Sequence, residues 1–394
     1  MSSGATLETK IQFHSESEPL PGSLFNRVGH SSMSMAGKPG FNGLSTRDWT
    51  LLSASVFSSR EVSSARNEFH KEHGATFPLA LAERAISLYA GEDDTVLDPF
   101  LGTGTTIIAA CKLNRKGIGF ELYDRFAFIA RNLLEEEKTQ RNMRASIGQD
   151  RVLNTDDLKI VEGDCLELIK ELEGNSIQLT FTSPPYADFI HKSVKDREKR
   201  AKSTMPSAIV TENKSSVSAY GESDRDFGNL DYESFLISVE ELMAEIYRVT
   251  KPGGYNVWVV KDYRDTKNLK PYIDVHTGIA NAGANVGFFY HDLIIWDQNA
   301  QRTLVLNGYP SVFYTNQNHS YLVVLRKPTI KQAKQLEKIF TKNQSEIYGS
   351  MKVADLRKIL RNRKLAVSGK KSDLISRLVD QDCLEWWRNY DAPQ

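Results

Sequence analysis

The chain has 394 residues, of which 40% are hydrophobic and 25% are charged, proportions typical of a folded soluble protein with one large domain and a smaller companion. Its 50 lysines and arginines balance 50 aspartates and glutamates, which excludes a protein that holds nucleic acid through its overall charge. The three scattered cysteines, Cys111, Cys165 and Cys383, exclude a disulfide framework and a zinc site.

The first 45 residues are rich in serine, glycine, proline and methionine and show no sustained periodicity. We therefore expect residues 1–45 to form a flexible arm. The chain has no run of ~18 apolar residues that would predict a membrane helix, and its N-terminus lacks the pattern of a signal peptide. These features favour a soluble, cytoplasmic protein with no membrane partner.

Apolar runs alternate with helical patterns over residues 46–330. The runs predict seven strands, at 95–100, 116–122, 158–163, 177–183, 255–261, 287–296 and 320–327. Apolar residues recur at helical spacing between most of them, most clearly over 232–249. This alternation predicts an α/β domain with a Rossmann-like, doubly wound sheet of seven strands.

The stretch VLDPFLGTGTT (96–106) follows the first of these strands. Its strand ends at Asp98, Gly102 and Gly104 let the backbone approach a ligand closely, and a helix is expected to begin at Thr105. A tight structural turn would explain the same residues. Two more acids, Glu121 and Asp164, follow the next two strands, and ligands of open α/β sheets bind at such strand ends.

The acids also narrow the class of ligand. The chain has no GxxxxGK[ST] motif, so a loop that holds a polyphosphate is not indicated. Because carboxylates repel phosphates, a neutral or cationic nucleoside suits this site better. S-adenosylmethionine, with its sulfonium and ammonium groups, is the natural candidate, and no metal is expected.

Two adjacent prolines follow the fourth predicted strand, in TSPPY (182–186). Neither Pro184 nor Pro185 has an N–H group, so nearby carbonyl groups stay free to accept hydrogen bonds from an amine. The Ser183 hydroxyl offers a second acceptor, and the Tyr186 ring offers a surface on which a base could stack. A rigid turn is the structural alternative.

DPFLGTGTT followed by TSPPY resembles the amino-methyltransferase family that modifies exocyclic nitrogens of DNA bases. In that family the TSPPY form is usual for cytosine-N4 enzymes and DPPY for adenine-N6 enzymes. The segment HGATFPLALAERAI (73–86) is similar to one that contacts the methionine end of the cofactor, and the resemblance covers roughly residues 70–327. The cofactor loop here precedes the catalytic loop.

The resemblance implies a site-specific DNA methyltransferase that transfers a methyl group from S-adenosylmethionine to N4 of a flipped-out cytosine, within a restriction–modification setting in a prokaryote or phage. The expected catalytic residues are Ser183, Pro184, Pro185 and Tyr186. The expected cofactor-binding residues are Phe77, Pro78, Asp98, Pro99, Phe100, Gly102, Gly104, Thr105, Glu121, Asp164 and Cys165. Adenine-N6 methylation, methylation of an RNA base and a non-enzymatic DNA-binding scaffold are the alternatives.

Residues 187–230 form a long connection without clean periodicity, which is typical of a functional insertion or of a solvated loop. We interpret this connection as a target-recognition insertion. Its basic residues are candidates for phosphate contacts: Lys192, Lys195, Arg197, Lys199 and Arg200.

Residues 331–348 read as a charged helical linker, and residues 349–394 resemble the SAP motif, a small helical module that binds nucleic acid. Between 351 and 380, nine basic residues face three acids, an excess of six positive charges in a chain of zero net charge. Such an excess is typical of a phosphate-binding surface, although a module that contacts another protein would also fit. The expected DNA contacts are Arg361, Lys364, Lys370 and Lys371.

Overall fold

The computed structural model describes residues 40–62, 77–148, 155–185, 221, 223–265, 268–300, 311 and 313–390. Residues 1–39 of the expected arm therefore lie outside the described residues, as does most of the connection at 187–230. No helix in the described part of the chain is both long and apolar enough to cross a membrane.

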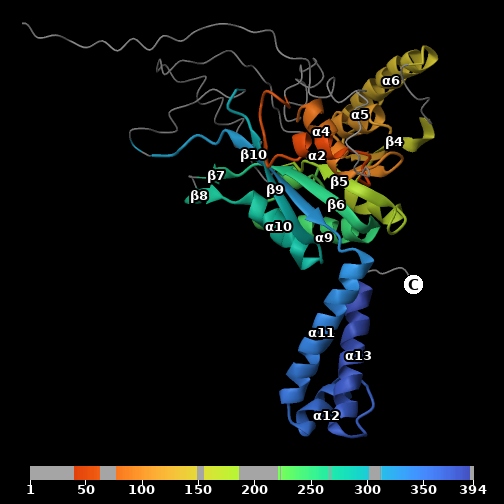
Figure 1. Cartoon of the computed structure of the whole chain (residues 1–394). Helices are drawn as coiled ribbons and strands as arrows, with labels where there is room; N and C mark the ends of the chain where they lie inside the picture. Colours follow the sequence, from red (N-terminus) through yellow and green to blue (C-terminus); the bar gives the residue numbers. More distant parts are fainter. Residues whose placement is uncertain are drawn as a thin grey trace, which may run out of the picture. The chain divides into compact units, whose positions relative to one another are not determined.

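A single large sheet organises residues 56–326 (Figure 1). In spatial order its eight described strands are β1 (Val56–Phe57), β9 (Phe289–Asp297), β10 (His319–Arg326), β6 (Thr250–Val260), β5 (Ile177–Thr182), β2 (Thr95–Asp98), β3 (Lys116–Glu121) and β4 (Leu158–Glu162). Among these described strands, only β10 is antiparallel to its neighbours. The mixed α/β class and all seven predicted strands are confirmed.

Two details of the sheet differ from the prediction. The two-residue strand β1 pairs with β9 and makes an eighth strand, too short to leave a periodic pattern in the sequence. Strand β6 begins at Thr250 and not at 255, because Thr250 pairs with Ile177 across a register irregularity. Neither difference changes the order of the predicted strands.

The strand order reverses between β2 and β5. The chain runs outward from β2 through β3 to β4 and then returns to place β5 on the other side of β2. All these strands are parallel, so their carboxyl ends lie at one edge of the sheet. At such a reversal the loops that follow the two neighbouring strands diverge and leave a crevice. The residues after Asp98 and after Thr182 therefore flank one space.

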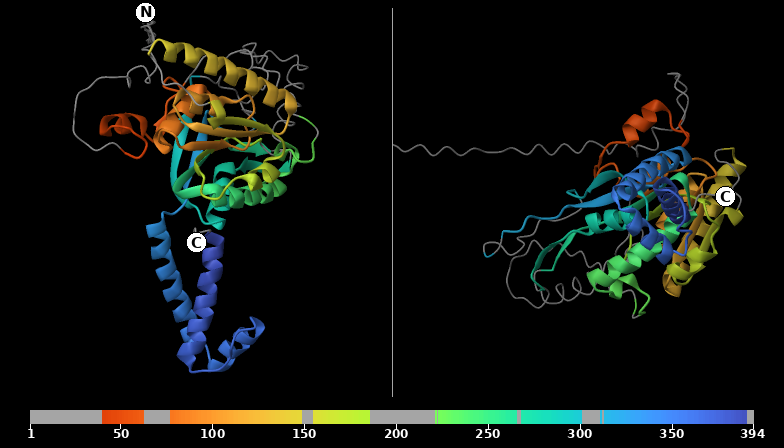
Figure 2. Two further views of the ribbon diagram at one scale, coloured as in Figure 1. Left: turned by 90° about the vertical axis from the view of Figure 1, so that its right-hand side faces the viewer. Right: turned by 90° about the horizontal axis from the view of Figure 1, so that it is seen from below.

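Helices cover both faces of the sheet (Figures 1 and 2). Helices α4 (Leu79–Tyr89), α5 (Thr105–Lys112) and α6 (Asp124–Ser146) cover one face, and α9 (Tyr232–Val249) and α10 (Val275–Asn285) cover the other. Consecutive residues of one strand, such as Val96 and Leu97, belong to different hydrophobic cores, because side chains alternate between the two faces. Burial on both faces explains the nearly continuous apolar runs in the sequence.

Shorter elements complete the domain. They are α2 (Thr46–Leu52), α7 (Cys165–Leu168), the 3-10 turns Thr155–Asp157, Ile169–Glu171 and Phe227–Asn229, and the hairpin strands β7 (Tyr263–Asp265) and β8 (Lys270–Ile273). The turn Phe227–Asn229 ends the long connection after β5 and leads into α9.

Three helices form the C-terminal part: α11 (Ile330–Ser350), α12 (Val353–Asn362) and α13 (Lys371–Tyr390). Their core contains Leu356, Leu360, Leu374 and Leu378. The predicted linker helix belongs to this core as well, because the Tyr348 hydroxyl of α11 donates to Asp382 of α13 at 2.7 Å.

Candidate functional site

A pocket opens at the carboxyl ends of β2, β3, β4 and β5, where the strand order reverses. The space within and in front of it, part of which is open solvent, is about 860 Å³. The described residues that line it come from the loops after these strands and from the turn before α9: Phe77, Pro99, Phe100, Leu101, Gly102, Thr105, Glu121, Leu122, Tyr123, Phe126, Gly163, Asp164, Cys165, Ser183, Pro184, Pro185, Arg225, Asp226 and Phe227.

The glycine loop makes the floor of the pocket. Gly102 and Gly104 have φ values of 56° and 93°, a left-handed backbone that glycine adopts without strain. A Cβ atom on Gly104 would also lie 3.0 Å from the Cβ of Ala130 in α6. The loop can therefore start α5 at Thr105 and still let α6 pack against it.

Thr105 lines the pocket and has a hydroxyl group without a hydrogen-bond partner among the described residues. Its hydroxyl oxygen is buried. Buried hydroxyl groups are rarely left without a partner. A polar ligand in the pocket would supply one.

Asp98 lies beneath the loop and not in the wall of the pocket. Its carboxylate accepts hydrogen bonds from the Thr106 hydroxyl at 2.5 Å, the Thr182 hydroxyl at 2.6 Å and the Phe100 amide at 3.1 Å. It is fully buried, and this burial raises its pKa to about 6. Asp98 thus joins the end of β5 to the glycine loop and acts on the pocket indirectly.

Glu121 forms one side of the pocket at the end of β3. One carboxylate oxygen accepts the Gly102 amide at 2.8 Å, and the other accepts the Tyr123 amide at 3.0 Å. Burial raises the pKa of Glu121 to about 7, and the neighbouring acids Asp98 and Asp226 add to this rise. Each oxygen keeps a second lone pair that can accept from a ligand.

This raised pKa predicts a dependence of stability on pH. Because the folded-state pKa of about 7 lies above the ordinary 4.5, protonated Glu121 stabilises the fold; this contribution is full below pH 4.5 and is lost as the pH rises through 7. The shift corresponds to about 3 kcal/mol. The free energy of unfolding is measured by urea unfolding for the wild type and for Glu121→Gln at each pH. The wild-type value minus the variant value should fall by about that amount between pH 5 and 8. Exposed Glu241→Gln is the control, and a pH-independent difference for Glu121→Gln would contradict the prediction.

Asp164 and Cys165 form the third side, after β4. Asp164 caps the short helix α7 by accepting the Leu166 amide at 3.0 Å, and its other oxygen lies 3.7 Å from the Arg225 guanidinium. Burial raises the pKa of the Cys165 thiol, which keeps it protonated and unsuited to act as a nucleophile.

The proline pair faces the same space. Strand β5 ends at Thr182, whose hydroxyl donates to Asp98, and Ser183, Pro184 and Pro185 then line the same pocket as the glycine loop. Thr182 and Asp98 are 84 positions apart in the sequence. Their hydrogen bond therefore holds together two loops that are distant in the chain.

The predicted site residues fall into three groups. The pocket brings together Phe77, Pro99, Phe100, Gly102, Thr105, Glu121, Asp164, Cys165, Ser183, Pro184 and Pro185. Pro78, Asp98 and Gly104 support these residues but are not among the described lining residues; Pro78 precedes α4 as its N-cap residue. Tyr186 and the basic residues Lys192, Lys195, Arg197, Lys199 and Arg200 lie outside the described residues.

Sequence reasoning missed the wall formed by Arg225, Asp226 and Phe227. The Phe227 ring packs edge-on against Phe100, with ring centroids 5.0 Å apart, so this wall contacts the glycine loop directly. Its residues lie near the end of the long connection (187–230) and precede α9, where no periodic pattern or motif marks them. Tyr123 was also missed, although its position two residues after Glu121 at a strand end was a usable signal.

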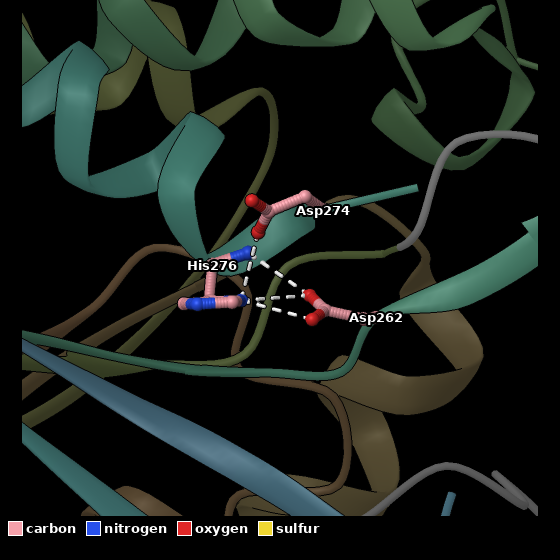
Figure 3. Close-up of side chains that lie close together, drawn as sticks. All are labelled: Asp262, Asp274 and His276. Carbon is pink, nitrogen blue, oxygen red and sulfur yellow. Dashed lines mark hydrogen bonds and ion pairs between the residues drawn. The ribbon is translucent and has the colours of Figure 1, made fainter. Parts of the chain in front are cut away.

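Asp262, Asp274 and His276 lie close together after β6 (Figure 3). Asp262 is buried and accepts from the Tyr272 hydroxyl at 2.7 Å, the Val275 amide at 2.9 Å and the His276 ring at 2.9 Å. The same ring nitrogen lies 2.8 Å from Asp274. These hydrogen bonds anchor β8 and the start of α10, and they account for the cluster without a metal ion.

The expected DNA contacts on the helical part lie at the surface. Arg361, Lys364 and Lys370 are exposed. Lys371 is exposed too, but its ammonium group donates to the Gly349 carbonyl at 2.7 Å. The Arg377 guanidinium stabilises the turn before α13, because it donates hydrogen bonds to the carbonyl groups of Ala366 and Ser368, at 2.9 and 2.6 Å.

Comparison with known proteins finds related sequences for part of the chain. Type II methyltransferase M.BglI of Bacillus subtilis is 38% identical over 107 residues, 27% of this chain and 30% of that protein. Type II methyltransferase M.MthZI of Methanothermobacter thermautotrophicus is 44% identical over 66 residues, 17% and 19% of the two chains. The chain thus spans less than a third of the length of these relatives.

Among solved structures, a putative DNA modification methylase from Thermus thermophilus aligns at 18% identity with a TM-score of 0.27. The alignment covers 50% of this chain and 72% of that one. Residues 44–132 match the family model described as DNA methylase, of the N6/N4 type, and residues 347–383 match the SAP domain. Residues 44–132, which include the glycine loop, are therefore similar to the DNA methylase family, and residues 347–383 are similar to the SAP domain.

Proposed function

We propose that the protein is an S-adenosylmethionine-dependent DNA methyltransferase that methylates the exocyclic N4 amine of cytosine. The observation that carries the proposal is one shared pocket, lined both by the glycine loop and by Ser183, Pro184 and Pro185. A methyl donor held on one side would face an amine held on the other. Holding two reactants in this way supplies much of the rate of a direct transfer.

The pocket residues fit the cofactor. Glu121 would accept from the ribose hydroxyls, Asp164 from the adenine amine, and the unsatisfied Thr105 hydroxyl would find a partner in the bound molecule. Acidic walls favour a positively charged group over a phosphate. When bound, the cofactor would supply a methyl group on a positively charged sulfur, which leaves as a neutral thioether.

The catalytic loop would bind the amine through acceptors. The lone pair of an exocyclic base amine is delocalised into the ring, so the nitrogen is a poor nucleophile. Ser183 Oγ and the Pro184 carbonyl could accept its two N–H bonds and favour a pyramidal nitrogen. These hydrogen bonds strengthen as positive charge develops in the transition state, which is the condition for catalysis. Cys165 has no part in this chemistry, because its thiol stays protonated.

The choice of cytosine rests on Ser183. A neutral hydroxyl stands where the DPPY form of the family has a carboxylate, and TSPPY resembles the cytosine-N4 enzymes. In duplex DNA the amine is reached only if the base leaves the helix, and Tyr186 would stack on the flipped base. Cytoplasmic DNA of a prokaryote or phage is the expected substrate, in a restriction–modification setting. Residues 46–330 would form the catalytic domain and residues 187–230 would include the target-recognition insertion.

One experiment tests the substrate. The full chain is incubated with isotopically labelled cofactor and with DNA or RNA, and the digested nucleosides are identified by mass spectrometry. N4-methylcytosine from DNA is the expected product. N6-methyladenine, or label in RNA alone, would overturn the substrate, and no label on either polymer would favour a DNA-binding scaffold.

The SAP domain would add affinity for the DNA backbone and would not read bases. Each phosphate contact that is lost reduces the slope of log K against log salt by ~0.9. Replacing Arg361, Lys364 and Lys370 with alanine should therefore flatten the slope by up to about 3, measured by fluorescence anisotropy between 50 and 200 mM salt. Three lysines of the sheet domain, Lys116, Lys159 and Lys170, form the matched control. Equal slopes for the two triple variants would refute the assignment.

A further inference from the structure

The wall formed by Arg225, Asp226 and Phe227 belongs to the last part of the long connection (187–230), where the chain again lines the pocket before α9 begins. Asp226 is 4% exposed, so its carboxylate is buried at the edge of the cavity. The neighbouring Arg225 is directed elsewhere, toward Asp164 at 3.7 Å. The donors that hold Asp226 among the described residues are uncharged.

Two such donors hold the carboxylate. The Tyr123 hydroxyl donates to Asp226 Oδ2 at 2.7 Å, and the Gly228 amide donates to Oδ1 at 2.8 Å. Tyr123 is itself tied to the cofactor loop, because its amide donates to Glu121, which also accepts the Gly102 amide. A continuous line of hydrogen bonds thus runs from the glycine loop across the pocket edge to the returning segment.

The same segment contacts the catalytic loop. A Cβ atom placed on Gly228 would lie 3.3 Å from Pro185 Cβ and 3.1 Å from Asp226 Oδ1, so the backbone there packs directly between the two. Phe227, which follows Asp226, packs against Phe100 of the glycine loop. Asp226 is therefore placed where the position of the wall determines the position of Pro185.

We propose that the hydrogen bond between Tyr123 and Asp226 is a latch that holds this wall against the cofactor pocket and, through Gly228, fixes Pro185 of the catalytic loop. Tyr123 and Asp226 are positioning residues for the adenosine side of the cofactor. The inference rests on the proposed function for the identity of the ligand. Without its tyrosine donor, the buried carboxylate would turn toward water, because a buried charge needs hydrogen bonds to remain buried.

The latch is tested by titrating the full chain with S-adenosylhomocysteine in a calorimeter. We expect Tyr123→Phe and Asp226→Ala each to raise its Kd by about tenfold, the scale of one charge-assisted hydrogen bond. The double variant should be no weaker than the weaker single variant, because both remove the same bond. Asp226→Asn keeps an acceptor for the tyrosine and should recover most of the affinity.

Tyr348→Phe is the matched control. Its hydroxyl makes the same kind of bond, 2.7 Å to Asp382, in the helical core, so its loss should leave the Kd for S-adenosylhomocysteine unchanged. Steady-state kinetics add a second measurement: the latch variants should raise the KM for the cofactor while the Kd for DNA stays constant. A merely structural role would lower the melting temperature without raising the KM for the cofactor.

The outcomes separate the two proposals. A wild-type chain that binds no S-adenosylhomocysteine would overturn the proposed function. A wild-type chain that binds it, with Tyr123→Phe and Asp226→Ala binding equally well, would overturn the latch alone. Single effects that multiply in the double variant would also refute the latch, because the two residues would then act independently.

Discussion

Methyl transfer should fall by about a hundredfold or more when Tyr186 is replaced by alanine, while the melting temperature and the cofactor Kd stay unchanged. Stacking of a base on an aromatic ring contributes ~1–3 kcal/mol, and a flipped base without this surface is poorly aligned with the methyl donor. Ser183, Pro184 and Pro185 line the pocket directly before Tyr186 in the chain. Single-turnover transfer to DNA, with enzyme in excess, measures the effect without product release.

Two variants control for this result. Tyr186→Phe keeps the ring and should keep most of the activity, which separates stacking from any role of the hydroxyl group. Tyr290→Ala removes an exposed tyrosine from β9, where its partner in the sheet is Leu325, far from the carboxyl ends of the parallel strands. Equal rates for Tyr186→Ala and Tyr290→Ala would refute the stacking role.

Asp98→Ala should weaken cofactor binding at least tenfold and lower the free energy of unfolding by about 2 kcal/mol. The substitution leaves the Thr182 hydroxyl and the Phe100 amide without this acceptor and leaves the Thr106 hydroxyl only the Phe181 carbonyl, at 3.5 Å. Each buried unpaired donor costs ~1–3 kcal/mol. The net loss is smaller than three such costs, because removing a buried carboxylate, whose pKa is raised to about 6, offsets part of them.

Urea unfolding and calorimetric titration measure the two effects of Asp98→Ala. Asp98→Asn retains an acceptor and should lie between the wild type and the alanine variant. Asp94→Ala, at the amino end of the same strand, removes an acid that pairs with Lys251 far from the pocket, so cofactor affinity should not change. If Asp98→Ala bound the cofactor as tightly as the wild type, the link between the two loops through Asp98 would be disproved.

Some residues of the site were predictable because their chemistry is local. Gly102 and Gly104 predict a turn with a left-handed backbone. Acids that follow successive parallel strands lie at one edge of a sheet. The direction in which a side chain points depends on contacts with residues that are distant in the sequence. Asp98 was expected to contact the cofactor, yet Thr106 and Thr182 hold it beneath the loop.

The sequence by itself determined the strands of the sheet and the two loops that flank the pocket, because apolar periodicity and special backbone residues act over a few neighbours. It also determined the helical SAP core, since the leucines that fill it recur at helical spacing. Only the tertiary structure decided how the pocket is closed. The bond between Tyr123 and Asp226 joins residues 103 positions apart, and the contact of Gly228 with Pro185 depends on where the long connection returns. Such contacts leave no periodic signal, because they arise from the packing of separate elements and not from either element alone.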